Sequence, residues 1–582
     1  MNVHEKFSLF FNDIKLRPFA YLVSKKLADG HTCINKNENY SSDFEDVIYQ
    51  YKDLDWTELN SNALVSITDN DKKPFVFYED NLYLYRYFNY ESQIVSNIKT
   101  LISEEKEQYQ SRKSFLTANA EYIKKPQVVS DNDNVSNVEK IDWQLVACIN
   151  SFLSNFSIIT GGPGTGKTTT VAKLLALLYK ENENLKVALS APTGKAGNRM
   201  LESLSTNNSI ENFGIKDKID ALKPFTIHRL LGDKRNSTSF KHDSNNSLNY
   251  DVVIVDEASM VDMALFSKLL ESIKPTSRII FLGDKEQLAS VEAGSLFGDL
   301  CNSLDTLNEL SEDNFDFINT FLKVENKLID SFKQPKQNNL LFGHIIDLKR
   351  SYRFDIESEI GNLSKAIINS KVDDVSDFFN DKQTVKIDVD YNDSTLREFV
   401  KTFDSYVEEE DTKKALEILN NSKILCAVKQ GKNGVYEVNK KIEQIFKGKL
   451  KTNQLFYENR PILVTKNYKD LDLFNGDIGI IRNDEACFLN SNNEIEKVRP
   501  ALIAECETVF AMTIHKSQGS EYNNVLVILP ESSENKLLTK ELLYTAVTRA
   551  KKNVTIQATK EVVLSTVQKS VKRSSGIIAK IK

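Results

Sequence analysis

The chain has 582 residues, of which 41% are hydrophobic and 27% charged, and its formal net charge is −7. This composition excludes a collagen-like, membrane-embedded or wholly disordered chain. The acidic balance also excludes a global positive field for nucleic acid, so any site for a polyanion must be local. Because so long a chain exceeds what one hydrophobic core supports, we expect roughly three to five domains.

The cysteines and the apolar segments indicate where the protein works. Its six cysteines are scattered, with no Cys-x-x-Cys pair and no His/Cys group at metal-ligand spacing, which favours free thiols in a reducing compartment. No apolar run approaches the length of a membrane span, and the N-terminus lacks a basic segment followed by an apolar one. We therefore predict a cytoplasmic protein with no membrane partner.

Residues 1–110 are rich in aromatic side chains and carry no motif with assignable chemistry. Stretches such as "FVFYEDNLYLYRYF" predict strands in the middle of this region, with helices on either side. We interpret the region as a partner-docking domain. Residues 111–137 include the polar, turn-forming stretch "SDNDNVSN" and are predicted to form a linker.

In residues 138–345, short β-branched runs that end in glycine or acidic turns alternate with helical patterns: "SIIT", "KVALSAP", "DVVIVDE" and "RIIFLGD". That alternation predicts a parallel sheet with crossover helices, and the polar stretch 302–345 is predicted to be an irregular excursion from it. From "IIDLKRSYR" onward we expect a second α/β domain, formed by residues 346–449 and 513–582. Between these parts, residues 450–512 show short strands without helical periodicity, which predicts a small all-β insertion.

The stretch "GGPGTGKTTT" follows the first predicted strand and precedes a helix, which is the context of a phosphate-binding loop. Backbone N–H groups of such a loop surround phosphate oxygens, Lys167 supplies a charge to the β- and γ-phosphates, and the hydroxyl of Thr168 is a Mg²⁺ ligand. The predicted nucleotide contacts are Gly161, Gly162, Pro163, Gly164, Thr165, Gly166, Lys167, Thr168 and Thr169.

Two later strand ends supply polar side chains to the same edge of the sheet. In "VVIVDEAS", Asp256 is predicted to hold Mg²⁺ and Glu257 to orient or deprotonate the attacking water. In "IIFLGDKEQLAS", Asp284 and Gln287 are placed where Gln287 can sense the γ-phosphate. Taken alone, each stretch could equally be a solvated strand end or a polar loop.

The ordered set of motifs resembles superfamily 1 helicases of the RecD family. It runs from "DWQ" through "GGPGTGKTTT", "APTGKAGNRM", "TIHRLLG", "VVIVDEASMVD" and "GDKEQLASVEAGSLFGD" to "LKRSYRF", "FNGDIGI", "AMTIHKSQGSEY" and "LLYTAVTRAKK". The resemblance implies an α/β chain of two RecA-like P-loop NTPase domains, with an N-terminal docking domain and an inserted small all-β, SH3-like domain.

The resemblance also assigns roles to residues outside the phosphate loop. Gln144 is implied to read the adenine edge, and Arg353 and Arg549 to reach the γ-phosphate from the second domain, although an isolated arginine is more often a surface charge. Contacts to single-stranded DNA are implied for Thr193, Lys195, Thr226, His228, Thr513, His515, Lys516 and Gln518. His228 and His515 could instead be ordinary core histidines.

Among RecD proteins the chain is most like the alpha subunit of exonuclease V, the RecBCD complex, because residues 1–110 show no helix-hairpin-helix turns of the free-standing members. The resemblance implies ATP- and Mg²⁺-dependent movement 5′ to 3′ on single-stranded DNA at duplex ends, in a heterotrimer with beta and gamma subunits that serves recombinational repair. A free-standing RecD-like helicase, an ATP-dependent assembly switch without translocation, and a nuclease stay as alternatives, although no nuclease constellation is visible.

Overall fold

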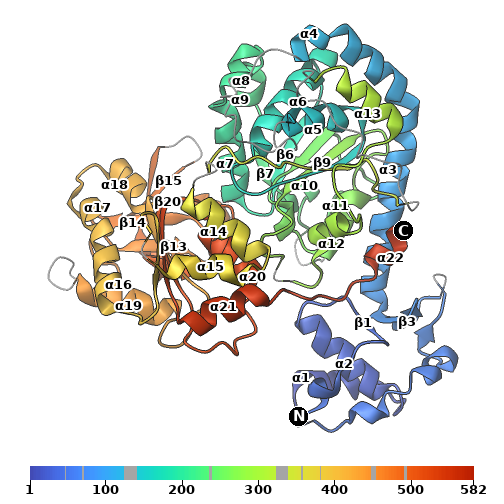
Figure 1. Cartoon of the computed structure of the whole chain (residues 1–582), viewed down its shortest axis with the longest axis horizontal. Coiled ribbons are helices and arrows are strands. Elements are labelled where there is room, and N and C mark those ends of the chain that lie inside the picture. Colours follow the sequence, from blue (N-terminus) through green and yellow to red (C-terminus); the bar gives the residue numbers. More distant parts are fainter. Residues whose placement is uncertain are drawn as a thin grey trace.

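The computed structural model describes the chain except for residues 46, 69–70, 124–140, 235–236, 238, 291, 323–338, 355–357, 381, 447–453 and 491–493. The described chain forms a small N-terminal domain and two α/β lobes, which we call lobe 1 and lobe 2 (Figure 1). Lobe 1 lies above the N-terminal domain, and lobe 2 lies beside lobe 1. The nucleotide-binding elements predicted from the sequence lie where the two lobes meet.

The N-terminal domain packs helices α1 (Val3–Ser8) and α2 (Arg17–Ala28) against a four-stranded sheet of order β1-β4-β3-β2. The strands are β1 (Cys33–Asn35), β2 (Val65–Ser66), β3 (Phe75–Tyr78) and β4 (Asn81–Leu84). Its core contains the fully buried rings of Phe19, Tyr21 and Phe75. Many of the aromatic residues that indicated docking therefore fill the domain's own core.

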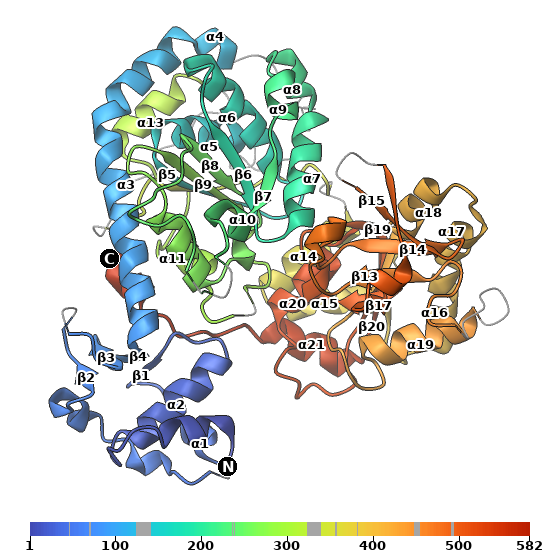
Figure 2. The ribbon, with the colours of Figure 1, turned by 180° about the vertical axis from the view of Figure 1, so that it is seen from behind.

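A single helix, α3 (Tyr85–Ala118), connects this domain to lobe 1 and runs along the side of that lobe (Figure 2). Its residues Ile94, Ile98 and Leu101 are buried in the core of lobe 1. The linker predicted at 111–137 therefore cannot begin at residue 111, because the helix continues through it to Ala118 and is followed by α4 (Ala120–Ile123). The rest of that predicted linker, from residue 124, lies outside the described residues.

Lobe 1 contains a six-stranded parallel sheet of order β10-β5-β9-β8-β6-β7. The strands are β5 (Phe156–Thr160), β6 (Val187–Ala191), β7 (Pro224–Thr226), β8 (Val252–Val255), β9 (Arg278–Gly283) and β10 (Ile345–Asp347). The helices are α5 (Trp143–Leu153), α6 (Lys167–Glu181), α7 (Gly194–Ser205), α8 (Asn208–Asn212), α9 (Lys216–Asp220), α10 (Ile227–Leu231), α11 (Met263–Glu271), α12 (Leu296–Asn302) and α13 (Glu312–Asn319).

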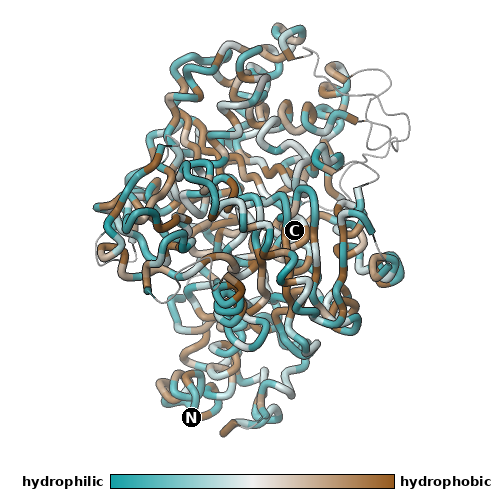
Figure 3. Tube along the Cα trace, turned by 90° about the vertical axis from the view of Figure 1, so that its left-hand side faces the viewer, coloured by the Kyte–Doolittle hydropathy of each residue, from teal (hydrophilic) through white to brown (hydrophobic). Residues whose placement is uncertain are grey.

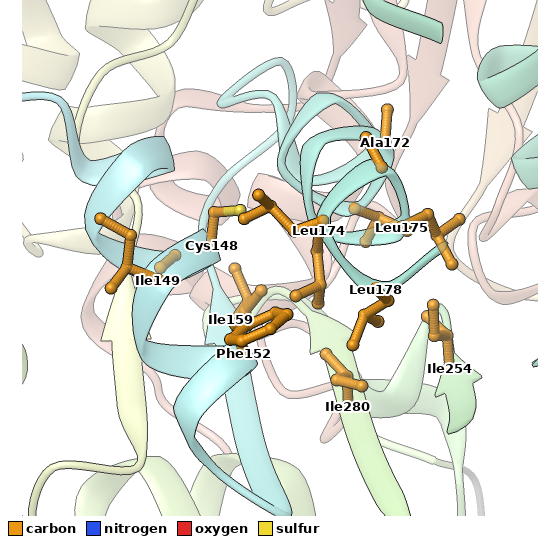
Figure 4. Close-up of a cluster of buried hydrophobic side chains, with 14 of the residues drawn as sticks. Cys148, Ile149, Phe152, Ile159, Ala172, Leu174, Leu175, Leu178, Ile254 and Ile280 are labelled. Atoms are coloured by element: carbon orange, nitrogen blue, oxygen red, sulfur yellow. The ribbon is translucent and has the colours of Figure 1, made fainter. Parts of the chain in front are cut away.

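Apolar side chains cover both faces of this sheet, as expected for a parallel sheet between helices. On one face, Phe152 of α5 and Leu174 and Leu178 of α6 pack against Ile159 and Ile280 of the sheet (Figure 4). Helices α3, α11 and α12 cover the other face. The apolar layers on the two faces of the sheet hold the strands in place. They therefore also determine the positions of the loops that follow the strands.

Two sequence predictions about the end of lobe 1 are wrong. The stretch 302–345 is not wholly irregular, because it contains α13, and Tyr109 of α3 donates a hydrogen bond to Asn314 of that helix. The run "IID" does not open the second domain, because its residues form β10, which pairs with β5 at the edge of the first sheet. Because β10 is far from β5 in the sequence, nothing in the residues around it indicates which strand it pairs with.

Lobe 2 contains a five-stranded parallel sheet of order β11-β20-β19-β12-β18. The strands are β11 (Val385–Asp388), β12 (Ser422–Cys426), β18 (Ala511–Thr513), β19 (Tyr522–Ile528) and β20 (Ala550–Gln557). The helices are α14 (Glu359–Ile368), α15 (Val372–Ser376), α16 (Asp393–Val400), α17 (Asp404–Glu408), α18 (Thr412–Leu419), α19 (Val435–Ile445), α20 (Lys540–Val547) and α21 (Lys560–Gln568).

The residues predicted as an all-β insertion form a five-stranded antiparallel sheet of order β16-β15-β14-β13-β17. Its strands are β13 (Pro461–Val464), β14 (Ile478–Arg482), β15 (Glu485–Leu489), β16 (Ile495–Val498) and β17 (Cys506–Thr508). The predicted boundary at 512 falls inside β18, which belongs to the parallel sheet of lobe 2. The predicted start at 450 lies outside the described residues.

The C-terminal segment leaves lobe 2 and returns to lobe 1, which corrects the assignment of all of 513–582 to the second domain. Arg573 donates hydrogen bonds to the carbonyl oxygens of Ser290 (2.8 Å) and Glu292 (3.2 Å) in lobe 1. Helix α22 (Ile577–Ile581) then packs on α3 and α12. Figure 1 shows this red segment crossing from lobe 2 to the side of α3.

Apolar segments along the chain are short and alternate with polar ones (Figure 3). None of the helices described combines the length and the apolar character needed to span a membrane.

We expect Ile577→Ala to destabilise lobe 1, because Ile577 is fully buried in its core. Truncating a buried isoleucine costs about 2–5 kcal/mol through lost burial and the cavity left behind. Thermal melting checks this against Ile578→Ala, a partly buried neighbour in the same helix. Equal melting temperatures for the two variants would contradict the anchoring role of α22.

Candidate functional site

A cleft of about 540 Å³ opens where lobe 1 faces lobe 2. Most of the residues predicted to act on a nucleotide line it, although they come from both halves of the chain. From lobe 1 these are Gln144, Pro163, Gly164, Gly166, Lys167, Thr168, Thr169, Asp256, Glu257 and Gln287, and from the second half Arg353 and Arg549. The other three predicted residues, Gly161, Gly162 and Thr165, form the back of the loop, where the Thr165 hydroxyl donates to the Gly162 carbonyl (2.8 Å).

The phosphate loop turns sharply between β5 and α6. Gly164 and Gly166 have φ angles of +76° and +86°, a left-handed conformation that favours glycine. A Cβ on Gly166 would also lie 2.0 Å from Nε2 of Gln144, so only glycine fits there. The Lys167 ammonium donates to the carbonyl oxygens of Gly161 (2.6 Å) and Gly162 (3.2 Å), so it lies folded over the loop.

The acidic pair lies opposite the loop at the end of β8. Burial, and then repulsion from Glu257, raise the pKa of Asp256 to about 6. Glu257 itself has φ +52°, a strained conformation for a residue with a side chain, and this turn directs the chain away from the sheet after Asp256. Two oxygen-bearing carboxylates at the strand end, near the Thr168 hydroxyl, form a hard donor set of the kind that Mg²⁺ prefers.

The strand end after β9 connects the cleft to lobe 2. The carboxylate of Asp284 accepts hydrogen bonds from the amide of Gln287 (3.2 Å) and from the hydroxyl of Tyr544 in lobe 2 (3.0 Å). One residue past Gln287, the backbone N–H of Leu288 donates to the Thr545 hydroxyl (3.0 Å). The side chain predicted to sense the γ-phosphate is therefore connected to α20 of the opposite lobe through the carboxylate of Asp284.

A partly buried carboxylate, Glu521, holds an arginine of lobe 1 and one of the second half in the cleft. It forms ion pairs with Arg353 and with Arg199 of α7, and lies 3.3 Å from the ammonium of Lys551. Burial alone would raise the pKa of Glu521, but these three cations outweigh burial and lower it to about 2. Arg549 is also buried, and it donates to the carbonyl oxygens of Thr545 (3.1 Å) and Ser520 (3.2 Å).

Gln144 is buried, and both ends of its amide are engaged by the protein. Its nitrogen donates to the Thr165 carbonyl (3.1 Å), and its oxygen accepts from the Lys173 ammonium (3.3 Å). In this conformation Gln144 supports the phosphate loop. Its role in reading adenine stays a prediction, and that role requires at least one of these hydrogen bonds to be exchanged.

Sequence reasoning missed Arg199, Glu521 and Tyr352, all of which line the cleft. Arg199 and Glu521 lie inside the recognised stretches "APTGKAGNRM" and "HKSQGSEY", but nothing local showed that they would form an ion pair. Tyr352 precedes Arg353, its ring is 51% exposed, and its backbone N–H donates to the Gly164 carbonyl (2.8 Å). A flat exposed ring at the edge of a phosphate site is suited to stacking on a base.

The residues of lobe 1 predicted to contact DNA lie at the starts of two helices. The Thr193 hydroxyl caps α7 and the Thr226 hydroxyl caps α10, each accepting a backbone N–H at 3.2 Å. Lys195 and His228 are exposed beside these caps. Lys195 also acts on lobe 2. The pKa of Lys423 in β12 is lowered to about 7, first by the burial of Lys423 itself and then by the positive charge of Lys195.

The matching residues of lobe 2 are less accessible. Thr513 is buried at the end of β18, and the Lys516 ammonium lies 2.9 Å from Glu507. His515 is partly buried, and burial lowers its pKa. Gln518 is buried and its amide donates to the Leu288 carbonyl of lobe 1 (2.9 Å), so in this conformation it joins the lobes and does not face solvent.

A phosphate loop in one parallel α/β lobe, completed by arginines of a second such lobe, defines the class of P-loop nucleoside triphosphatases with two RecA-like domains. Family models agree: residues 144–293 match an AAA domain, and residues 508–556 match a UvrD-like helicase C-terminal domain. The chain therefore binds nucleotide.

Curated relatives give the family. The chain is 32% identical to the RecBCD enzyme subunit RecD of Haemophilus influenzae, over 93% of this chain and 86% of the relative. It is also 32% identical to the RecD subunit of Buchnera aphidicola subsp. Schizaphis graminum, over 85% and 83%. Bacteroides Pif1 bound to single-stranded DNA aligns with 74% of this chain and 94% of its own, with TM-score 0.36 and 18% identity. The protein belongs to the RecD family and is an ATP-dependent DNA helicase of recombinational repair.

Glu521→Gln is expected to lower stability at pH 7 by about 1–3 kcal/mol, because it leaves two partly buried arginines without their carboxylate. Since folding lowers the pKa of Glu521 from 4.5 to about 2, its contribution is complete above pH 4.5 and is lost as the pH falls towards 2. The difference in melting temperature between wild type and variant should therefore shrink below pH 4.5.

The matched control is Glu505→Gln, because Glu505 pairs with Lys466 on the surface and both side chains are more than half exposed. It should melt within about 1 °C of wild type, since exposed pairs contribute little. A pH-independent difference for Glu521→Gln would show that its carboxylate charge is not what holds the arginines.

Proposed function

We propose that the protein moves 5′ to 3′ along single-stranded DNA from duplex ends, driven by hydrolysis of Mg²⁺-bound ATP, as the alpha subunit of a cytoplasmic heterotrimer with beta and gamma subunits of the RecB and RecC type. The observation that carries the proposal is one cleft lined by Lys167 of lobe 1 and by Arg353 and Arg549 of the second half. The assembly is carried over from the RecBCD subunits that the chain resembles, and the direction of movement is what the resemblance to RecD helicases implies.

The phosphate loop and the acidic pair supply the lobe 1 side of the reaction. Lys167 exchanges its loop carbonyl partners for the β- and γ-phosphates, which are stronger acceptors for a cation. Thr168 and Asp256 would hold Mg²⁺, which neutralises phosphate charge as it develops. Glu257 orients the attacking water, and Gln287 reports the state of the γ-phosphate to α20 through Asp284 and Leu288.

The second half supplies the charge that completes the site. Arg353 is held by Glu521 in this conformation, so the γ-phosphate must compete with that carboxylate for the guanidinium. Binding of the triphosphate then draws the two halves together, and loss of the γ-phosphate releases them. Thr193 and Lys195 lie on one lobe, and Thr513 and Lys516 lie on the other. Each cycle of ATP binding and hydrolysis would therefore change the distance between two sets of residues that bind the DNA strand.

Lys167→Gln and Arg549→Ala are each expected to lower DNA-stimulated ATP turnover at least about 10³-fold, since an arginine that stabilises transferring phosphate contributes about 10³ to 10⁵ in rate. Arg549→Ala should still bind a fluorescent ATP analogue, whereas Lys167→Gln should bind it more weakly. Lys99→Gln, which removes an exposed lysine on α3, serves as the control. Full turnover in the Arg549 variant would remove the second half from the site.

Single-stranded DNA should stimulate ATP turnover, and the purified protein or its native complex should unwind duplexes with a 5′ overhang in preference to those with a 3′ overhang. Raising the salt concentration should weaken DNA binding, because neutralisation of phosphates dominates such affinities. An ATPase rate unchanged by DNA would favour the assembly switch. Unwinding only from 3′ overhangs would overturn the proposed direction.

A further inference from the structure

A second pocket, of about 450 Å³, lies on lobe 1 away from the nucleotide cleft. It is formed by the edge strand β7, helix α10, the start of β6 and the segment that leads into β8. Its volume falls within the ~300–1,000 Å³ of small-ligand sites. The lining residues are Lys186, Phe225, Arg229, Leu230, His242, Leu248, Asn249 and Tyr250.

The charge of this pocket is opposite to that of the chain. Its lining contains Lys186, Arg229 and His242 but no carboxylate, whereas the whole protein carries a net charge of −7. Within the part of the chain that the structure describes, neither the Lys186 ammonium nor the Arg229 guanidinium has an ion pair. Both are exposed, and the Arg229 guanidinium lies 4.2 Å above the ring of Phe474 in the loop that joins β13 and β14 of the antiparallel sheet. Unpaired cations around a concave site favour an anionic ligand.

The remaining lining groups favour a ligand that also carries a flat, polar-edged ring. Phe225 and Tyr250 are half-buried, so each keeps part of its ring in the pocket. The amide oxygen of Asn249 accepts from the Lys274 ammonium (3.0 Å), so its nitrogen is the group that can donate to a ligand. The Nδ1 atom of His242 is hydrogen-bonded to the Asn246 carbonyl (3.0 Å), which leaves Nε2 for a ligand. Phosphate, sugar and base together match this set of groups.

We propose that this pocket binds one nucleotide unit of single-stranded DNA, with its base against Tyr250 and Phe225 and its phosphate at Lys186 and Arg229. The inference rests on the proposed function and adds a site to it. Phe225 and Arg229 flank Thr226 and His228, the predicted DNA contacts on the same β7–α10 segment. A strand that reaches those residues therefore meets the pocket directly.

Such a pocket would also let the chain bind DNA although its net charge is negative. Base stacking on an aromatic ring adds affinity that is independent of sequence, and one or two unpaired cations are enough to place a phosphate beside it. Because Arg229 also contacts Phe474, a nucleotide bound here would lie against the junction of lobe 1 with the antiparallel sheet. The site would thus hold the strand on lobe 1 while lobe 2 moves.

The test uses the full-length protein and a labelled oligothymidylate of about 20 nucleotides, with binding followed by fluorescence anisotropy over a salt series. Tyr250→Leu should weaken binding about 5- to 140-fold, the range for loss of one base–aromatic stack. Lys186→Gln should lower the slope of log affinity against log salt by about 0.7, the value for one phosphate contact on a single strand. Lys99→Gln, an exposed lysine on α3, should change neither quantity.

A second measurement locates the strand. An oligonucleotide carrying 5-iododeoxyuridine should form a photocrosslink to Tyr250 or Phe225, which peptide mass spectrometry identifies. Basal ATP turnover should stay at the wild-type value in Tyr250→Leu and Lys186→Gln, because neither residue lines the nucleotide cleft. Because Tyr250 packs against the core of lobe 1, binding is measured well below the melting temperature of each variant.

The outcomes separate this inference from the proposed function. Wild-type binding by Tyr250→Leu and Lys186→Gln, with weaker binding by Lys195→Gln, would overturn the pocket and leave the helicase function standing. Suppression of the crosslink by millimolar thymidine monophosphate, with oligonucleotide affinity unchanged in both variants, would assign the pocket to a free nucleotide and overturn the strand site. A wild-type protein that binds no oligonucleotide would overturn both proposals.

Discussion

The ion pairs of Glu521 with Arg199 and Arg353 are the contacts on which the nucleotide cleft depends. Lys167, Arg199, Arg353 and Arg549 all line that cleft, and so many like charges in a partly buried site repel one another. Glu521 reduces this repulsion, which is why its own pKa lies near 2. Without this carboxylate, Arg199 and Arg353 would lose their anionic partner inside the cleft.

A triphosphate brings more negative charge to the same cations. In the proposed mechanism it competes with Glu521 for Arg353. The two lobes are already joined there by hydrogen bonds from Tyr544 to Asp284 and from Gln518 to Leu288. These contacts couple the strand end beside the γ-phosphate to helix α20 and to the stretch that carries Thr513 and Lys516. The contacts that connect the cleft to the residues predicted to bind the strand are thus a few short hydrogen bonds.

The sequence was sufficient for features that depend on neighbours along the chain. The phosphate loop needs Gly164 and Gly166 for its positive φ angles and Lys167 at the start of a helix, and all three are encoded within ten residues. Parallel strands were equally visible, because buried β-branched runs alternated with helices. The pair Arg199–Glu521 could not be predicted, because it joins residues of different lobes whose relative placement depends on the whole fold. The inward-facing amide of Gln518 escaped prediction for the same reason, although its motif was recognised.

Lobe 1 takes its last strand and its last helix from distant parts of the chain. Strand β10 pairs with β5 only after residues 345–347 exist, and α22 covers α3 and α12 with residues that follow all of lobe 2. On the ribosome, the N-terminal domain and the first five strands of lobe 1 must therefore wait, with part of their apolar surface uncovered, until translation has passed residue 577. Lobe 1 therefore reaches its native packing late in synthesis, although most of its strands are made early.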